Sequence, residues 1–376
     1  MTIHAVVGGQ FGSEAKGHVA AQIAAKLSTA RLGSKQHQVR VGGSNAGHSA
    51  VAADGKVWAL RQVPAAAVID VDADLYIAQG SEVDFEVLQS EVAALDAAGY
   101  KVSQRLMIDA NATVIEQHHI ERETNSDINA RTGSTSKGIG AARADRIMRI
   151  AKTVRDLEVI FGSLGTVCET APLLHNANRR GEHIIIEGTQ GYGLGMHTRF
   201  YPQTTSGDCR TVDLLAQIGY LPLDPSESRE IHTWLVLRTY PIRVAGNSGS
   251  MDSDELTWNE LGERTGGYVQ PERTTVTKKI RRVAEWNPSV VMQAVQANGG
   301  AHMRLHPCLM FVDYFEPKLA GETDLAALAR YPDALVNVRH CEIAIGKRAA
   351  MYGTSPSTVM TRDYDLHEAI SDWRYK

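Results

Sequence analysis

The sequence has few cysteines and lacks any long hydrophobic run. Its 376 residues include four widely separated cysteines and no C-x-x-C pair, which argues against a disulfide framework and predicts a reduced, cytosol-like setting. No apolar stretch approaches the roughly 18 residues that a membrane span needs. Residues 1–4 show no basic segment ahead of an apolar one, so we expect no signal peptide and a cytoplasmic protein.

The chain also lacks an excess of charge of one sign. Lysine and arginine number 39 against 43 aspartates and glutamates, a net charge of −4. This balance argues against a nucleic-acid coat protein and against a membrane-surface binder. Hydrophobic residues make up 43% of the chain, a value that disfavours disorder. We therefore expect a globular protein with neither nucleic acid nor membrane as a partner.

Apolar runs typical of strands alternate with helical patterns from end to end. A helix is predicted over 19–27 from apolar positions four apart, and Ser81 with Asp84 predicts the start of another that stops at Gly99. Strands are predicted near residues 3–7, 75–78, 183–186, 234–239 and 309–312.

This alternation predicts one α/β domain over residues 1–376, with a mostly parallel central sheet and surrounding helices. The site is then expected in loops beyond the carboxyl ends of the strands. Two polar stretches, 113–149 and 246–282, are predicted to be long substrate loops.

The strongest local signal is a glycine-rich loop, residues 8–18, directly after the first predicted strand. Its glycines let backbone N–H groups converge on phosphate oxygens, and Lys16 can reach a phosphate. It is not a Walker A loop, because Gly17 stands where that motif has serine or threonine. A tight strand-to-helix turn without a ligand is the alternative.

Three further loops carry groups suited to binding or catalysis. Residues 40–49 place His48 among glycines, where an imidazole could stabilise charge or act as an acid, or simply be structural. Residues 187–193 present Gln190, which can donate to and accept from a purine edge; a flexible turn is the alternative. Residues 274–282 interleave threonines with basic residues, which favours a dicarboxylate over a solvated surface run.

Taken in order, these loops resemble those of adenylosuccinate synthetase over nearly the whole chain. The family's G-Q-W-G-D-E-G-K-G, for example, is similar to residues 9–17. Several such matches in a fixed order are specific, whereas any one alone would be weak. The segments that carry the resemblance are 9–17, 42–49, 134–140, 187–191, 201–206, 275–281 and 353–356.

The resemblance implies a ligase that joins aspartate to C6 of a 6-oxopurine nucleotide in two steps. The purine loses its N1 proton, O6 attacks the γ-phosphate of a nucleoside triphosphate, and the aspartate amine then displaces the 6-phosphate. Mg²⁺ would neutralise the transferring charge. A homodimer is also implied, in which Arg149 is lent to the monophosphate site of the other subunit.

The resemblance also implies a role for individual residues. Ser13 and His48 would be catalytic, and Ser13 and the Gly47 carbonyl would contact Mg²⁺. The donor's phosphates would be bound by Gly12, Ser13, Glu14, Ala15, Lys16, Gly17, Gly47, His48, Ser49, Gly353, Ser355 and Pro356, and its base by Asp313. The nucleoside monophosphate would be bound by Ser13, Asn45, Ser134, Thr135, Arg149, Gln190 and Thr205. The aspartate would be bound by Thr275, Val276, Thr277, Lys279 and Arg281.

Ser13 departs from the family, which has an aspartate there as N1 base and Mg²⁺ ligand. A carboxylate beside N1 would also lie near C2, where guanine carries an amino group. The shorter hydroxyl leaves room for that group and can accept its hydrogen bond. We therefore expect dGMP as substrate, as in the viral branch that makes 2-aminoadenylosuccinate toward diaminopurine DNA, with a host cytoplasm as location. An inactive homologue and an IMP-using enzyme with a substitute base are the alternatives.

Two other departures concern the sugar and the donor. Lys279 replaces an arginine that approaches the ribose 2′-hydroxyl, which would weaken a preference for ribonucleotides. The family's Lys-Leu-Asp guanine-binding triplet reads Phe311-Val312-Asp313, so we expect ATP or dATP as donor. The runner-up is an ordinary adenylosuccinate synthetase that uses IMP and GTP. A nucleotide-switch protein, from a different class, would carry Walker A and have no use for a dicarboxylate loop.

Overall fold

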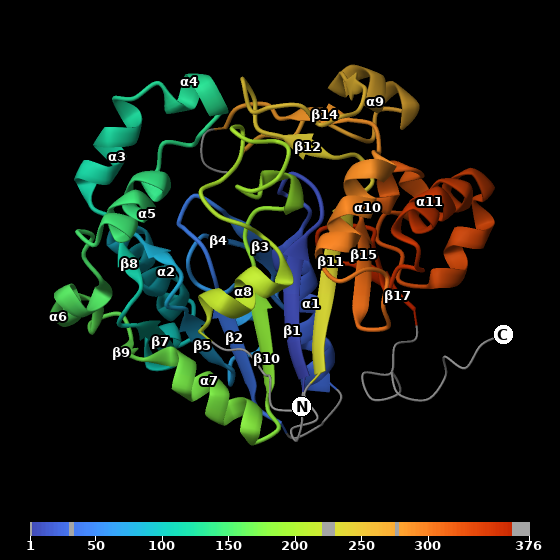
Figure 1. Ribbon diagram of the computed structural model, residues 1–376. Helices are drawn as coiled ribbons and strands as arrows, with labels where there is room; N and C mark the ends of the chain where they lie inside the picture. Colours follow the sequence, from blue (N-terminus) through green and yellow to red (C-terminus); the bar gives the residue numbers. More distant parts are fainter. Residues whose placement is uncertain (1, 30–33, 220–229, 275–277, 363–376) are drawn as a thin grey trace.

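A ten-stranded sheet runs through the part of the chain that the structure, a computed structural model, describes: residues 2–29, 34–219, 230–274 and 278–362. Neighbouring strands are parallel except at one edge, where β16 and β17 are antiparallel. This arrangement confirms the predicted α/β class (Figure 1). In spatial order the strands are β17 (Val359–Thr361), β16 (Met351–Gly353), β15 (Leu305–Met310), β11 (Glu230–Arg238), β1 (Thr2–Gly8), β10 (His183–Glu187), β2 (Gln36–Arg40), β5 (Asp74–Ile77), β7 (Leu106–Asp109) and β9 (Thr166–Cys168).

Helices cover both faces of this sheet. In β1, Ile3 and Val7 pack toward α7, α8, α10 and α11, whereas Val6 packs toward α1 on the other face. A parallel strand buried on both faces needs successive apolar residues, which is the pattern that predicted this strand. None of the described helices combines the length and hydrophobicity needed to cross a bilayer. The helices are α1 (Lys16–Thr29), α2 (Phe85–Ala97), α3 (Gln117–Thr124), α4 (Ile128–Thr132), α5 (Ile139–Met148), α6 (Glu158–Phe161), α7 (Thr170–Arg179), α8 (Thr211–Gln217), α9 (Trp258–Arg264), α10 (Pro288–Ala297) and α11 (Pro332–Ile345).

Short elements beyond the large sheet occupy the two predicted substrate loops. The first loop contains α3, α4 and α5, and the second contains α9 (Figure 1). These stretches are therefore partly helical rather than bare loops. The small strands are β3 (His48–Val51) with β4 (Val57–Leu60), β6 (Glu82–Val83) with β8 (Thr113–Val114), and β12 (Ile242–Arg243) and β13 (Glu255–Leu256) on either side of β14 (Arg282–Ala284).

Two predicted element ends are wrong by a few residues. Helix α2 begins at Phe85 rather than near Ser81, because Asp84 is its N-cap and accepts from Val87 N at 3.2 Å. Strand β15 ends at Met310 rather than at residue 312, because Phe311 adopts a φ of 63° and starts a turn. In both cases a local backbone cap, invisible to hydrophobic periodicity, sets the boundary.

Candidate active site

A cleft lies beyond the carboxyl ends of β1, β2 and β10, where the predicted loops meet. Its cavity measures about 230 Å³. Segments that are distant in sequence converge here, as the parallel topology predicts. The predicted site residues that line the cleft are Gly12, Ser13, Lys16, Asn45, Gly47, His48, Ser134, Thr135, Gln190, Thr205, Lys279 and Arg281.

The other predicted residues are placed elsewhere. Arg149 caps the carboxyl end of α5, and Asp313 lies in the turn after β15. Thr275, Val276 and Thr277 lie outside the described residues. The described residues that were predicted for the site but do not line this cleft are Glu14, Ala15, Gly17, Ser49, Arg149, Asp313, Gly353, Ser355 and Pro356.

The glycine-rich loop folds around the carboxylate of Glu14. Glu14 Oε1 accepts from the backbone N–H groups of Gln10 (3.2 Å) and Gly12 (2.8 Å). Glu14 Oε2 lies 2.5 Å from Lys16 Nζ, and both side chains are buried. Glu14 therefore holds the loop together, whereas Lys16 bonds to Glu14 and also lines the cleft. An anion that binds to the Lys16 ammonium group therefore shares that group with the Glu14 carboxylate.

Several non-glycine residues beside the cleft have a left-handed backbone. Ser13 has a φ of 56°, Ala15 of 77° and Gln190 of 62°. This conformation costs an L-residue about 1 kcal/mol or more, and it persists where the surrounding structure fixes it, often at functional sites. Ser13 is exposed and lines the cleft.

His48 is oriented by an ion pair beneath the cleft. Its Nδ1 lies 2.5 Å from Glu187 Oε1, an oxygen that also accepts from Arg40. The other carboxylate oxygen, Oε2, accepts from Ala65 N at 2.7 Å. Arg40 Nη1 lies 2.5 Å from the same Nδ1. Glu187 can only accept and Arg40 can only donate, so these two contacts fix the position of the ring but do not assign its proton to Nδ1 or Nε2.

The same contacts set the charge of both groups. Burial, and then Arg40, lower the pKa of His48 to about 4. Burial alone would raise the pKa of Glu187, but Arg40 and then His48 outweigh it and hold that pKa at about 2. At neutral pH the protein therefore has a neutral imidazole on a fixed carboxylate, and His48 can accept a proton when an anion arrives.

Arg243 also lines the cleft, and sequence reasoning missed it. Its guanidinium donates to Gln203 O and Ser250 O, both at 2.6 Å, and lies 4.7 Å from the ring centre of Phe11. Burial, and then Arg282, lower its pKa to about 10, so it stays charged. The available signal was an arginine in the short strand β12. This signal is weak because Gln203 and Phe11 are far away in the sequence.

The predicted donor-base residue, Asp313, already has a partner. Its Oδ2 accepts from Tyr268 Oη at 2.6 Å, and burial raises the pKa of the carboxyl group to about 6. The neighbouring Phe311 lies under the guanidinium of Arg238, whose carbon is 3.9 Å from the ring centre. The position that is lysine in the family triplet is therefore aromatic here, beside an arginine.

Comparison with known proteins agrees with this arrangement. The family model of adenylosuccinate synthetase matches residues 5–164 and 160–316. Adenylosuccinate synthetase of Methanococcus vannielii is 32% identical over 365 residues, covering 96% of this chain and 99% of the relative. The enzyme of Methanocaldococcus jannaschii is 31% identical, covering 96% and 97%.

Two solved structures share the fold. Succinoaminodeoxyadenylate synthetase of cyanophage S-2L, bound to dGMP and to dATP as an energy donor, has a TM-score of 0.73 and 28% identity, and the match covers 96% of this chain and 95% of that chain. Fully ligated adenylosuccinate synthetase of Plasmodium falciparum has a TM-score of 0.75 at 16% identity, covering 96% and 99%. The chain belongs to the adenylosuccinate synthetase family and is a carbon–nitrogen ligase that uses aspartate and a nucleoside triphosphate.

Proposed function

We propose that this enzyme joins L-aspartate to C6 of dGMP while hydrolysing ATP or dATP, which gives 2-amino-2′-deoxyadenylosuccinate for diaminopurine nucleotide synthesis. The observation that carries the proposal is Ser13, which lines the cleft at a position where the family has a carboxylate. It leaves room for a guanine 2-amino group and can accept its hydrogen bond. Similarity to the cyanophage enzyme, whose structure holds dGMP and dATP, supports this substrate.

His48 acts on the charge that develops at O6 and the γ-phosphate. Its Nδ1 contacts Glu187 and Arg40, so Nε2 is the ring nitrogen left for the reacting atoms. The neutral imidazole takes up a proton when the anionic nucleotides bind and then donates a hydrogen bond to O6 as the 6-phosphoryl group forms. Lys16 grips the phosphates. Ser13 is not the base, and the N1 proton leaves to water or to the carboxylate of the substrate aspartate.

Mg²⁺ is the cofactor that the family implies, and it would neutralise the phosphate charge during transfer. Ser13 and Gly47 line the same cleft, and a serine hydroxyl and a backbone carbonyl are hard oxygen donors. Mg²⁺ is commonly held by a few protein oxygens together with substrate phosphates, so these residues fit it. Both donors are neutral, and the Glu14 carboxylate is taken up by its own loop, so the nucleotides supply the negative charge.

Lys279 and Arg281 bind the two carboxylates of aspartate, together with Thr275, Val276 and Thr277 outside the described residues. Both basic side chains line the cleft. Burial lowers the pKa of Arg281 from its ordinary value, but the nearby Glu272 favours its charged form. A partly desolvated guanidinium is well suited to a bidentate carboxylate.

The active unit is a homodimer of single-domain subunits that each lend Arg149 to the partner's monophosphate. Arg149 is exposed, and the neighbouring side chains Ile147, Met148 and Ile150 are 73%, 67% and 71% exposed. Three large apolar side chains in four residues form a patch that a second subunit would cover. Asn45, Ser134, Thr135, Gln190 and Thr205 hold the same nucleotide from within the subunit.

The donor is ATP or dATP rather than GTP. The family's guanine-binding lysine is replaced by Phe311, and one oxygen of Asp313 is occupied by Tyr268. Gly353, Ser355 and Pro356 complete the donor site. The archaeal relatives, all adenylosuccinate synthetases by name, favour the second candidate, an ordinary enzyme that uses IMP and GTP in the cytoplasm.

One assay separates the two candidates. The purified enzyme is incubated with aspartate, Mg²⁺ and each pairing of dGMP or IMP with ATP, dATP or GTP, and the succinylated nucleotide is quantified by chromatography. We expect product from dGMP with ATP or dATP. Turnover of IMP with GTP and none of dGMP would establish the ordinary synthetase instead.

A further inference from the structure

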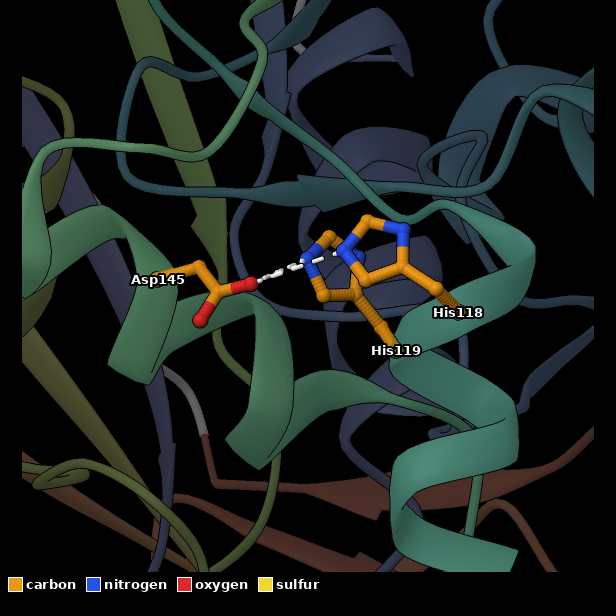
Figure 2. Close-up of side chains that lie close together, drawn as sticks. All are labelled: His118, His119 and Asp145. Atoms are coloured by element: carbon orange, nitrogen blue, oxygen red, sulfur yellow. Dashed lines mark hydrogen bonds and ion pairs between the residues drawn. The ribbon is translucent and has the colours of Figure 1, made fainter.

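A cluster of His118, His119 and Asp145 lies outside the cleft, between α3 and α5 (Figure 2). Asp145 Oδ2 is 3.1 Å from His119 Nε2 and 3.5 Å from His118 Nε2. His119 and Asp145 are buried, whereas the His118 side chain is 56% exposed. Two imidazoles and a carboxylate at this spacing are potential ligands of a transition metal.

Hydrogen bonding argues against metal binding by His119. Its Nδ1 accepts from the backbone N–H of Glu116 at 2.9 Å. Burial, and then His118, lower the pKa of His119, so the ring is neutral and its single proton is on Nε2. That proton is donated to Asp145, and Nε2 has no lone pair left for a metal.

Helix α3 instead ties down both ends of α5. At the amino end, Glu123 accepts from the backbone N–H groups of Gly138 (2.8 Å) and Gly140 (2.7 Å). At the carboxyl end, Arg122 Nη1 donates to Asp145 Oδ1 at 2.8 Å, and His119 holds the other oxygen. An aspartate in the last turn of a helix opposes the helix dipole. Arg122 first, and then His118 and His119, stabilise its charge there and lower the pKa of Asp145.

Asp145 also builds the turn that presents Arg149. Its backbone carbonyl accepts from the N–H groups of Ile150 (3.0 Å) and Ala151 (3.3 Å), which closes the helix. Arg149 is part of this turn and has a left-handed φ of 64°, a conformation usually taken by glycine. The direction in which Arg149 leaves the helix therefore depends on where Asp145 is held.

We infer that His119 and Arg122 hold Asp145 so that Arg149 is aimed at the monophosphate of the partner subunit. We call His119, Arg122 and Asp145 the α3–α5 clasp. The inference rests on the proposed function, in which Arg149 is shared across the dimer. None of the three residues of the clasp lines the cleft, so we assign them as positioning residues.

The first test compares kinetic constants of clasp variants. Asp145→Asn and His119→Phe should raise KM for the monophosphate about tenfold and leave kcat and the KM for aspartate within about twofold. His119→Gln, which keeps an amide donor for Asp145, should restore most of the affinity. Gln117→Ala, an exposed α3 residue whose side chain bonds to Glu121 rather than to Asp145, is the matched control and should behave as wild type. Equal losses in every constant, or normal KM values in folded Asp145→Asn and His119→Phe, would overturn the inference.

Mixed dimers show in which subunit the clasp acts. Pairing an Asp145→Asn subunit with a His48→Ala subunit leaves one working site, which receives Arg149 from an intact clasp, and its KM should be normal. Placing both changes in one subunit beside a wild-type subunit should give the raised KM. The same two pairings with Arg149→Leu test the shared site itself.

Each pattern has one meaning. We call a normal KM with the two changes in different subunits, and a raised KM with both in one subunit, the crossed pattern. If the Arg149→Leu dimers show this pattern and the Asp145→Asn dimers do not, the clasp inference alone is wrong. If neither set shows this pattern, Arg149 is not shared between subunits, and the clasp inference is wrong as well. Stoichiometric Zn²⁺ binding that is lost in His118→Ala, measured by calorimetry on the whole dimer, would also overturn the clasp in favour of a metal site.

Discussion

Among single residues, Ser13 bears most directly on the choice of substrate. Ser13→Asp restores the family's carboxylate and crowds the guanine 2-amino group. We expect kcat/KM for dGMP to fall by about a hundredfold or more, because a misfit that leaves polar groups unpaired costs several kcal/mol. Activity on IMP should be kept or should rise. The measurement is the dGMP-to-IMP ratio of kcat/KM in both proteins.

Ser13→Ala serves as the control for that change. It keeps the space but removes the acceptor, so the loss on dGMP should be about tenfold, in line with a single hydrogen bond. If the dGMP-to-IMP ratio does not fall in Ser13→Asp, or if wild type already prefers IMP, the ordinary synthetase is the correct assignment.

His48 gives a second prediction at this scale, because burial and Arg40 lower its pKa to about 4 in the free protein. A group that is neutral before binding and cationic afterwards must take up a proton. We expect an uptake approaching one proton per site at pH 7 when the nucleotides bind, since the phosphate charge favours imidazolium. Calorimetry in buffers of different ionisation enthalpy measures it. His48→Ala should abolish both the uptake and turnover while leaving dGMP affinity within a few-fold; an unchanged uptake would assign the proton to another group.

Among the elements, hydrophobic periodicity located the strands that are buried on both faces, such as β1 and β10. The motif match at residues 9–17 could not predict the orientation of the Glu14 side chain. A motif gives the identity of a residue but not whether its carboxylate faces a ligand or its own loop. Neither periodicity nor motifs identified Arg243, whose partners Gln203 and Phe11 come from distant loops. Contacts of this kind arise only when the sheet brings the loops together.

The packing of the loops around Glu14 leads to an element-scale prediction. A Cβ on Gly191 would overlap Glu14 Oε1 and lie 2.7 Å from Gln10 O. We expect Gly191→Ala to lower stability by about 1–3 kcal/mol, as overpacking does, and to reduce kcat because the first loop must shift. Thermal unfolding and steady-state kinetics measure both effects.

Gly262→Ala is the control for Gly191→Ala. Gly262 lies inside α9, and the nearest atom to an added Cβ is Val269 O at 3.4 Å. Alanine is favoured over glycine in a helix by about 1 kcal/mol, so this variant should be as stable as wild type or more so. A Gly191→Ala enzyme with normal Tm and kcat would mean that the loops do not pack as described.

At the scale of the whole molecule, histidines are buried together at the opposite end of the sheet from the cleft. His4, His232 and His306 come from the adjacent strands β1, β11 and β15, and His232 Nδ1 lies 2.6 Å from His306 Nε2. Burial, and then His232, lower the pKa of His306 to about 2; burial, and then His183, lower that of His4. The folded sheet thus keeps these rings neutral, whereas the unfolded chain would protonate them near pH 6.5.

This difference fixes the sign of a pH effect on stability. Below about pH 6.5 the unfolded chain binds more protons than the folded one, so the free energy of unfolding must fall as the pH falls. Each histidine that stays neutral in the folded sheet should lower the free energy of unfolding by about 2 kcal/mol at pH 5. Glu187, with a pKa of about 2, loses its contribution only at more acidic pH. Urea unfolding at pH 7, 6 and 5 measures the slope, which His306→Gln should flatten and the exposed-site control His340→Gln should not. A pH-independent free energy of unfolding over this range would mean that these rings can be protonated within the folded sheet.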